Sequence, residues 1–456
     1  MGLSGSLSIA VQSLEAQQAA VQVTANNIAN VNTPGYTRRV AVLAEQAPFS
    51  TETDSAGGGG VSLQQVQDIR DSVLNIRINQ ETASQSQLTA LQQQLGPVQT
   101  LFNAQSGAGL DTAIDGFYSA LQQLSTNPTN GAQRQSVITA AQTMAQTFNQ
   151  VSNGITEQIA GANQYVVQNV AQVNALTSQI GTLNGQIASL QNLQQNAAAL
   201  EDQRGTLLNN LSQLMGFTQI TGSNGEVTLT TAGGQELVSG TEAVTLTTQP
   251  NGAVQDIYAG GTDITSSISG GSIAGLIQAR DTDLPNLAKQ LDALATTIAS
   301  GINTQNAAGF DGSGNPGGNL FVPPSATNAA ANMALATTDP NAIAASASSS
   351  NAGDNSNLLA MVNLQNTPNG SGLTPDDAYA AMVSTIGSLV QGADTEQQAS
   401  QAVLTQLQNQ QAAYSGVSMD EESVNLTQFQ QAYQAAARVV GVINTLSSLA
   451  INLGQD

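Results

Sequence analysis

The stretch LSGSLSIAVQSLEAQQAAVQVTANNIANV, residues 3–31, is highly informative, because large apolar residues recur in it every seven positions. Leu7, Leu14, Val21 and Ile28 fall on one heptad position, and Leu3, Ala10 and Val31 lie on the neighbouring row. The stretch LTQFQQAYQAAARVVGVINTLSSLA, residues 426–450, repeats the pattern with two rows, Leu426, Tyr433 and Val440, and Phe429, Ala436, Ile443 and Ala450. A seven-residue apolar repeat keeps one stripe of a helix towards a partner helix. The sequence therefore predicts helices at both ends of the chain that pair as a coiled coil.

The C-terminal helix carries a second apolar set, formed by Val442, Leu446, Leu449 and Leu453. A helix that is apolar on two faces needs burial on more than one side. Chain ends are usually frayed in globular proteins, so this placement predicts ends that dock on sister copies. A helix of about 30 residues with an exposed seam is only marginally stable in water, so we expect the ends to become ordered on assembly. Removal of residues 1–40 or 415–456 should then leave a folded, soluble remainder that does not assemble.

Helical periodicity also dominates the interior of the chain. The longest seam combines Val166, Val173, Ile180 and Ile187 with Leu176, Leu183 and Leu190. It predicts a helix of about 60 residues, which would be about 90 Å long at 1.5 Å per residue. The Gly96-Pro97 pair predicts a kink or stop in an earlier helix.

The period changes to two between residues 217 and 270. Val227 alternates with Leu229, and the pairs Asn224-Gly225 and Asn251-Gly252 are typical of hairpin turns. The predicted fold class is therefore mainly α, an elongated rod of long helices with one small inserted antiparallel β-domain. We expect axial segments at 1–50 and 415–456, a helical domain at 51–216 and 271–414 with a loop region at 309–356, and an outward-facing β-domain at 217–270. The run of glycines from Gly57 to Gly60 predicts a flexible joint.

Composition excludes several function classes. The chain has 31 acidic and 9 basic residues and a net charge of -22, so we expect it to bind neither nucleic acid nor anionic membranes. It has no cysteine and no histidine, which excludes disulfides, Cys–His and Ser–His–Asp catalysis, and histidine-based zinc sites. No apolar run approaches the ~20 residues of a membrane span, and the N-terminus has no secretory signal pattern. We expect no cofactor, no metal and no catalytic residue.

Two acidic clusters are candidate sites. Glu421 stands at capping-box spacing from Ser418, and Asp420 and Glu422 add negative charge where the helix dipole favours it, so the cluster is explained as the start of a helix. Paired glycosidase carboxylates remain an alternative. Asp311, Ser313 and Asn315 imitate the first ligands of a calcium loop, but Val322 stands where the bidentate glutamate is needed. A turn is the favoured interpretation of that second cluster.

Two stretches are more specific than any heptad. Residues 25–36, ANNIANVNTPGY, resemble the N-terminal signature of the flagellar rod, hook and hook-associated family, with Asn26, Asn27, Asn30, Asn32, Thr33, Pro34, Gly35 and Tyr36 as its turn. Residues 415–422, SGVSMDEE, followed by QQAYQAAAR at 430–438, resemble the C-terminus of the hook-associated members that join hook to filament. Shorter stretches at 200–204, 271–276, 302–317 and 353–357 fit the same proteins.

This resemblance implies a structural, non-catalytic subunit that assembles into a ring of identical copies. By the resemblance, the N-terminal helix polymerises through Leu3, Leu7, Leu14, Val21, Ile28 and Val31. The C-terminal helix would polymerise, and be held by a cytoplasmic export chaperone, through Leu426, Phe429, Tyr433, Ala436, Val440, Ile443, Leu446 and Leu449. The further implied partners are the hook protein, a second junction protein and the filament cap during assembly. The implied location is the extracellular flagellum, reached without a cleavable signal. A rod or hook subunit, a cell-wall glycosidase and a coiled-coil adhesin remain alternatives.

Overall fold

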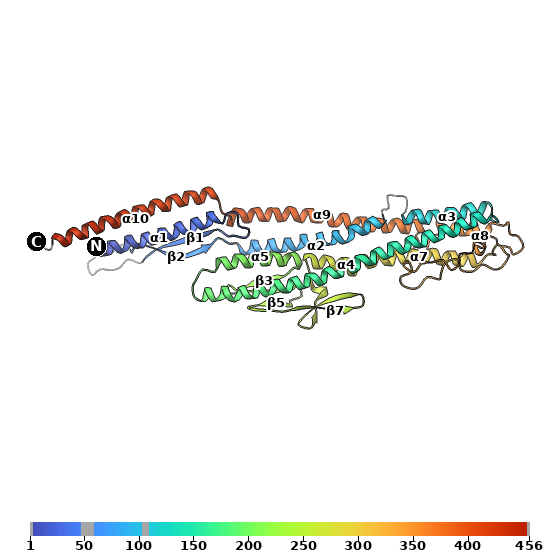
Figure 1. Cartoon of the computed structure of the whole chain (residues 1–456), viewed down its shortest axis with the longest axis horizontal. Helices are drawn as coiled ribbons and strands as arrows, with labels where there is room; N and C mark the ends of the chain where they lie inside the picture. The colour runs from blue at the N-terminus through green and yellow to red at the C-terminus, as the bar shows by residue number, and fades with distance from the viewer. Residues whose placement is uncertain (1–2, 47–58, 103–108, 454–456) are drawn as a thin grey trace. The chain divides into compact units, whose positions relative to one another are not determined.

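The computed structural model describes residues 3–46, 59–102 and 109–453 (Figure 1). Gly57 and Gly58 of the predicted joint lie outside these residues. The chain divides into two compact units. Unit 1 combines residues 1–82, 172–245 and 401–456, and unit 2 combines residues 83–171 and 246–400. The N- and C-terminal parts of the chain thus share one unit.

In unit 1 the helices α1 (Leu3–Ala29) and α10 (Met419–Leu453) lie side by side and antiparallel, with both chain termini at the same end of the pair (Figure 1). The predicted pairing of terminal helices is confirmed. A hairpin of β1 (Arg39–Glu45) and β2 (Val61–Asp68) also packs on α1. Its strands are antiparallel, with Arg39 opposite Asp68 and an irregularity between Val42 and Leu43.

Three long helices contribute residues to both units: α2 (Ser72–Phe102), α4 (Gly131–Asn192) and α9 (Pro375–Ser415). The 62 residues of α4 match the long helix predicted from the seam through Val166, and all four residues of that row are buried. Of the predicted kink or stop at Gly96-Pro97, the stop is wrong, because α2 continues to Phe102 with Pro97 inside the helix. Leu95 and Val98 flank the proline and are fully buried, so packing outweighs the lost backbone hydrogen bond.

The β-region forms two sheets where one domain was expected. The first, in unit 1, has the order β3 (Thr218–Thr221), β4 (Val227–Thr230), β5 (Glu236–Ser239) and β6 (Glu242–Ala243). The second, in unit 2, consists of β7 (Leu246–Asn251), β8 (Val254–Ala259) and β9 (Thr262–Asp263). Both predicted Asn-Gly turns are present, with positive φ at Gly225 and Gly252. The sheets separate where Val244 bonds back to Leu237 and Leu246 starts the next strand.

Unit 2 is a helical body around one continuous apolar core. Its other helices are α3 (Leu110–Thr126), α6 (Gly271–Gln278), the π-turn η2 (Ala279–Asp283), α7 (Leu284–Ala307) and α8 (Ser356–Asn363), with short 3-10 turns at Thr265–Ser267, Pro340–Ala342 and Leu364–Asn366. Phe117 packs edge-on against Phe321 in this core. Residues 309–356 are mostly loops, and isolated bridges stand where short strands were expected. Asp311 there accepts the backbone N–H groups of Ser313 and Asn315, which is the geometry of a turn.

Two glycines of α4 provide a matched test of its packing against the first sheet. A Cβ at Gly181 would lie 2.7 Å from the Thr241 carbonyl oxygen, whereas one at Gly161 would meet nothing within 4 Å. We expect Gly181→Ala to destabilise the protein by about 1–3 kcal/mol through overpacking. Gly161→Ala should stabilise it by up to about 1 kcal/mol through helix propensity. Urea unfolding of both variants measures the difference, and equal effects would contradict this packing.

Candidate functional site

The residues predicted for polymerisation lie on or next to α1 and α10, which pack against each other, and they differ in burial. On α10, Ile443 is buried, and Leu426, Phe429, Ala436 and Val440 are partly buried. The predicted Tyr433, Leu446 and Leu449 are instead exposed, by 39%, 49% and 57%. The two predicted rows therefore face the rest of unit 1 along most of their length, and part of the predicted set remains open.

On α1 the burial differs from the predicted seam. Small residues are buried most completely, namely Ala10, Ala16, Ala20 and Thr24. The larger residues Leu7, Leu14, Val21, Ile28 and Val31 are only partly buried, and Leu3 is exposed. The distance between packed helices depends on the side chains at their contact, and small side chains allow a close approach. Since α1 packs on both the hairpin and α10, its centre accommodates only small residues.

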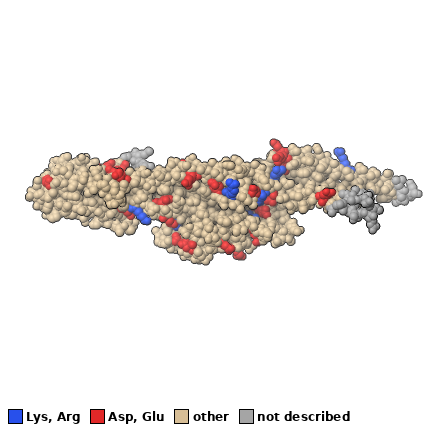
Figure 2. Space-filling view, turned by 180° about the vertical axis from the view of Figure 1, so that it is seen from behind, with Lys and Arg blue, Asp and Glu red and all other residues tan. Residues whose placement is uncertain are grey.

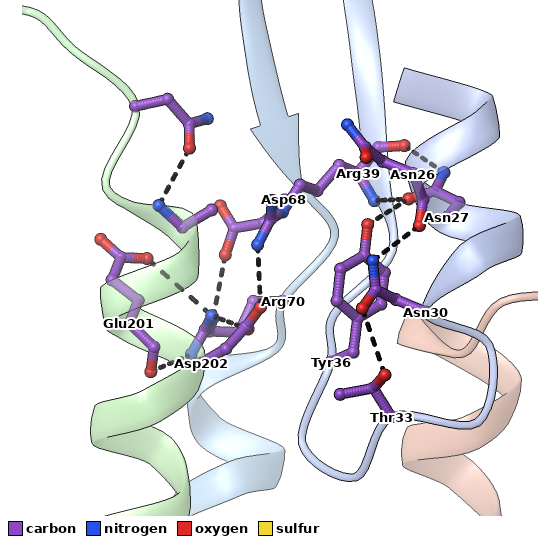
Figure 3. Close-up of polar contacts among 12 residues, drawn as sticks. Asn26, Asn27, Asn30, Thr33, Tyr36, Arg39, Asp68, Arg70, Glu201 and Asp202 are labelled. Carbon is purple, nitrogen blue, oxygen red and sulfur yellow. Dashed lines mark hydrogen bonds and ion pairs between the residues drawn. The ribbon is translucent and has the colours of Figure 1, made fainter. Parts of the chain in front are cut away.

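Asn27 is the centre of the predicted signature turn (Figure 3). Its side chain is 1% exposed, and its carbonyl oxygen accepts hydrogen bonds from the Tyr36 hydroxyl (2.8 Å) and the Arg39 N–H (3.1 Å). Its amide nitrogen donates to the Arg39 carbonyl (2.8 Å) and to Glu422 Oε2 (3.1 Å). One buried side chain thus joins α1, β1 and α10 with all of its hydrogen-bonding groups satisfied.

The remaining signature residues shape the turn around Asn27. Asn30 donates to the Asn26 carbonyl and accepts from the Thr33 hydroxyl, and Gly35 adopts a φ of +79°. Burial raises the pKa of the Tyr36 hydroxyl, which keeps it a hydrogen-bond donor. Asn26, Asn32, Thr33, Pro34 and Gly35 are exposed.

The start of α10 is held by Arg38. Its Nη1 donates to Glu421 Oε2 at 3.0 Å. Its Nε lies 2.9 Å from Glu422 Oε1, and this second contact is an ion pair without the alignment of a hydrogen bond. The Arg38 backbone N–H also donates to the carbonyl of Ser415, the last residue of α9. Ser418 accepts the N–H of Glu421 as predicted for a cap, at 3.4 Å, but the Glu421 carboxylate is bound by Arg38 instead of closing a capping box. Asp420 is exposed.

A second ion-pair network was not predicted. Asp202 on α5 (Ala198–Leu214) accepts from Arg39 at 3.1 Å and from Arg70 at 2.7 Å, and Arg70 also pairs with Asp68 at 2.9 Å (Figure 3). The available signal was the family resemblance of the stretch LEDQR at 200–204, which contains Asp202. Nothing in the linear sequence indicated that its partners are Arg39 and Arg70.

A hollow of about 720 Å³ lies beside this network in unit 1, between the signature turn, α5 and β3. Its lining is mostly uncharged and polar, and the charged groups in it include the paired Arg70 and Asp202. Among the described residues no cluster of three or more acidic side chains is arranged to hold a metal ion. The arrangement of paired charges and amides is suited to holding segments together.

The surface of α10 presents several large apolar side chains that are exposed. Val439, Val442, Leu446 and Leu449 are spaced three and four residues apart, so they share one face, here called the outer row. Each is between 49% and 59% exposed. Charged residues are sparse on the face drawn in Figure 2, in keeping with a chain in which only 9% of residues are charged. A contiguous exposed apolar row is typical of a surface that contacts protein or membrane.

Comparison with known proteins agrees with these features. Residues 95–321 match the family described as flagellar hook-associated protein FlgK helical domain. Residues 7–37 match the flagella basal body rod protein family, and residues 408–453 match the C-terminal family of flagellar basal body rod FlgEFG proteins. The two terminal matches cover the signature turn and α10.

Curated relatives are similar to the chain over nearly their whole length. The flagellar hook-associated protein 1 of Escherichia coli is 28% identical, over 99% of this chain and 100% of the relative. That of Bacillus subtilis is also 28% identical, over 98% and 97%. The solved structure of the flagellar hook junction protein FlgK from Burkholderia pseudomallei shares the fold, with a TM-score of 0.66 and 20% identity over 75% of this chain and 100% of that one. The chain belongs to the flagellar hook-associated protein 1 family.

Proposed function

We propose that the chain is a structural, non-catalytic subunit of the bacterial flagellum that joins the hook to the filament. The observation that carries the proposal is the α1–α10 pair, which buries one face of α10 and leaves the outer row open. Full burial of one Val or Leu side chain is worth about 1.5–3 kcal/mol, so covering the row would contribute several kcal/mol per subunit before the cost of association. Sister copies in a ring are the proposed cover.

In this proposal α1 and α10 form the axial part of each subunit, and the two small sheets face outward. The partners implied by the family are the hook protein, the second junction protein, the filament cap during assembly and a cytoplasmic chaperone that holds α10 before export. The subunit would reach the extracellular flagellum without a cleaved signal. The C-terminal half of α10 would become fully ordered on assembly.

Residues Pro375–Asn452, which span α9 and most of α10, include a window of mean hydropathy 1.2. By length and composition alone this stretch could cross a membrane. One such stretch is weak evidence for a span, and it includes the outer row. Because α10 also carries Glu422 bound to Asn27 and Arg38, we propose that protein, and not lipid, covers this helix.

The test is deletion of residues 419–456 in the source bacterium, combined with labelling of the full-length protein. We expect the truncated chain to stay folded and soluble but to leave hooks without filaments, because neither the pair nor the outer row can form. Immunogold label on the full-length chain should lie at the tip of the hook. Label on the hook shaft or the rod would favour a rod or hook subunit and contradict the proposal.

The enzyme alternative has a separate test. Glu421 and Glu422 are both bound to Arg38, which is unsuited to a pair of glycosidase carboxylates facing each other across a cleft. We expect no turnover of peptidoglycan by the purified chain. Turnover that is lost in Glu422→Gln would overturn the structural assignment.

A further inference from the structure

We propose that Asn27 and Glu422 form a polar pair that sets the register of α1 against α10. Both side chains are almost completely buried, at 1% and 2% exposed, and they are joined by a hydrogen bond of 3.1 Å. They lie in a contact that is otherwise made mainly of small and apolar residues. A single polar residue in a coiled-coil seam is known to specify register at some cost in stability.

Glu422 belongs to the seam of α10 by its position. It lies one heptad before Phe429, and Ala436 and Ile443 continue the same row. All four residues are buried or partly buried. Glu422 is the charged member of this row, so it is the point at which the row differs from a simple apolar repeat.

The apolar part of the seam does not define one register by itself. If α10 slid along α1 by one heptad, about 10 Å, Phe429, Ala436 and Ile443 would each move by one position of the seven-residue repeat and would still face α1. The small residues Ala16 and Ala20 of α1 present little shape against which such a slide would clash. The connection to α9 is a three-residue linker that begins with Gly416, and a first helical turn can wind or unwind next to it.

A slid arrangement would instead be penalised at Glu422. Asn27 and Arg38 are fixed by their own bonds to the Arg39 backbone and to the Ser415 carbonyl, so they would not follow the helix. The Glu422 carboxylate would then be buried without its partners, which is the costly situation for a charge. Removing one partner is costly for the same reason, whereas replacing both by apolar residues removes the penalty and with it the choice of register.

The chain contains no cysteine, so introduced pairs report register directly. A step of seven residues back along α1 and forward along α10 from the Asn27–Glu422 contact places Ala20 opposite Phe429, and a second step places Ser13 opposite Ala436. The native-register pair is Ser13→Cys with Ala436→Cys. The slid-register pair is Ala20→Cys with Ala436→Cys, whose residues are about 10 Å too far apart along the axis in the native arrangement for a disulfide.

Oxidation of the purified full-length chain should cross-link only the native-register pair. With Asn27→Leu and Glu422→Leu added, the slid-register pair should cross-link with a yield comparable to the native one. The matched control is Asn26→Leu with Asp420→Leu, which changes two exposed side chains near the pair and also removes one carboxylate, and it should behave like the parent. The proposal is overturned if the leucine variant keeps only the native cross-link, or if the parent forms both cross-links or neither.

The significance for assembly rests on the proposed function, because a slid α10 would displace the outer row by about 10 Å relative to its neighbours. Cross-linking of the isolated chain does not depend on that function. A failed localisation at the hook tip with the expected cross-links would remove the function and leave the register inference standing.

Discussion

A variant with Leu446→Glu and Leu449→Glu is expected to fold normally and to lose filament assembly completely. Both side chains are about half exposed in the isolated chain, so their replacement should change the free energy of unfolding by less than about 0.5 kcal/mol. In the proposed ring the same positions would be covered by a neighbouring copy. An unpaired carboxylate buried there would cost several kcal/mol in each subunit, and the penalty would be repeated around the ring.

The measurement is swimming motility and electron microscopy of hooks in a strain that expresses only the variant. The control variant, Asn444→Glu with Ser448→Glu, adds the same two charges to exposed positions in the same turns of α10 but outside the outer row. We expect it to retain filaments. Normal filaments with the leucine variant would show that the outer row is not an assembly surface.

Asn184→Leu is expected to have the largest effect on stability. Asn184 is fully buried on α4, and its amide donates to the carbonyls of Val227 and Gly240, both at 2.8 Å. Its oxygen accepts from the Val227 N–H and from Arg204 Nη1. Leucine would leave these buried groups unpaired, at a cost on the order of 3–5 kcal/mol.

Urea unfolding, with proteolysis between residues 218 and 243 as a local probe, would measure this loss. Asn192→Leu, at an exposed position in the last turn of the same helix, serves as the control and should be near neutral. If the two variants unfold alike, Asn184 does not anchor the first sheet to α4.

Periodicity predicted the helices and their pairing well, because a heptad reports directly which face of a helix is covered. The rows through Leu426 and Phe429 and the row through Val166 are at least partly buried, apart from the exposed Tyr433 and Ala450. The same reasoning misjudged α1, where Ala16 and Ala20 are buried more deeply than Leu14. Helices that approach closely favour small residues at the contact, and apolar size alone does not reveal how close the approach is.

The polar contacts could not be predicted in the same way. Asn27 stood out as part of a signature, but its bond to Glu422 links residues that are 395 positions apart. The pairing of Asp202 with Arg39 and Arg70 likewise depends on the fold that brings them together. The β-region divides into two sheets where the Val244 N–H donates to the Leu237 carbonyl. The alternation of side chains does not report such a backbone hydrogen bond.

The Asn27–Glu422 bond joins the first helix of the chain to its last. A polypeptide that is delivered one end first cannot close this bond until nearly all of its residues have arrived. A chain truncated before α10 would contain α1 without its partner helix, even if the residues between them fold correctly. We therefore expect that only a full-length copy can form the α1–α10 pair.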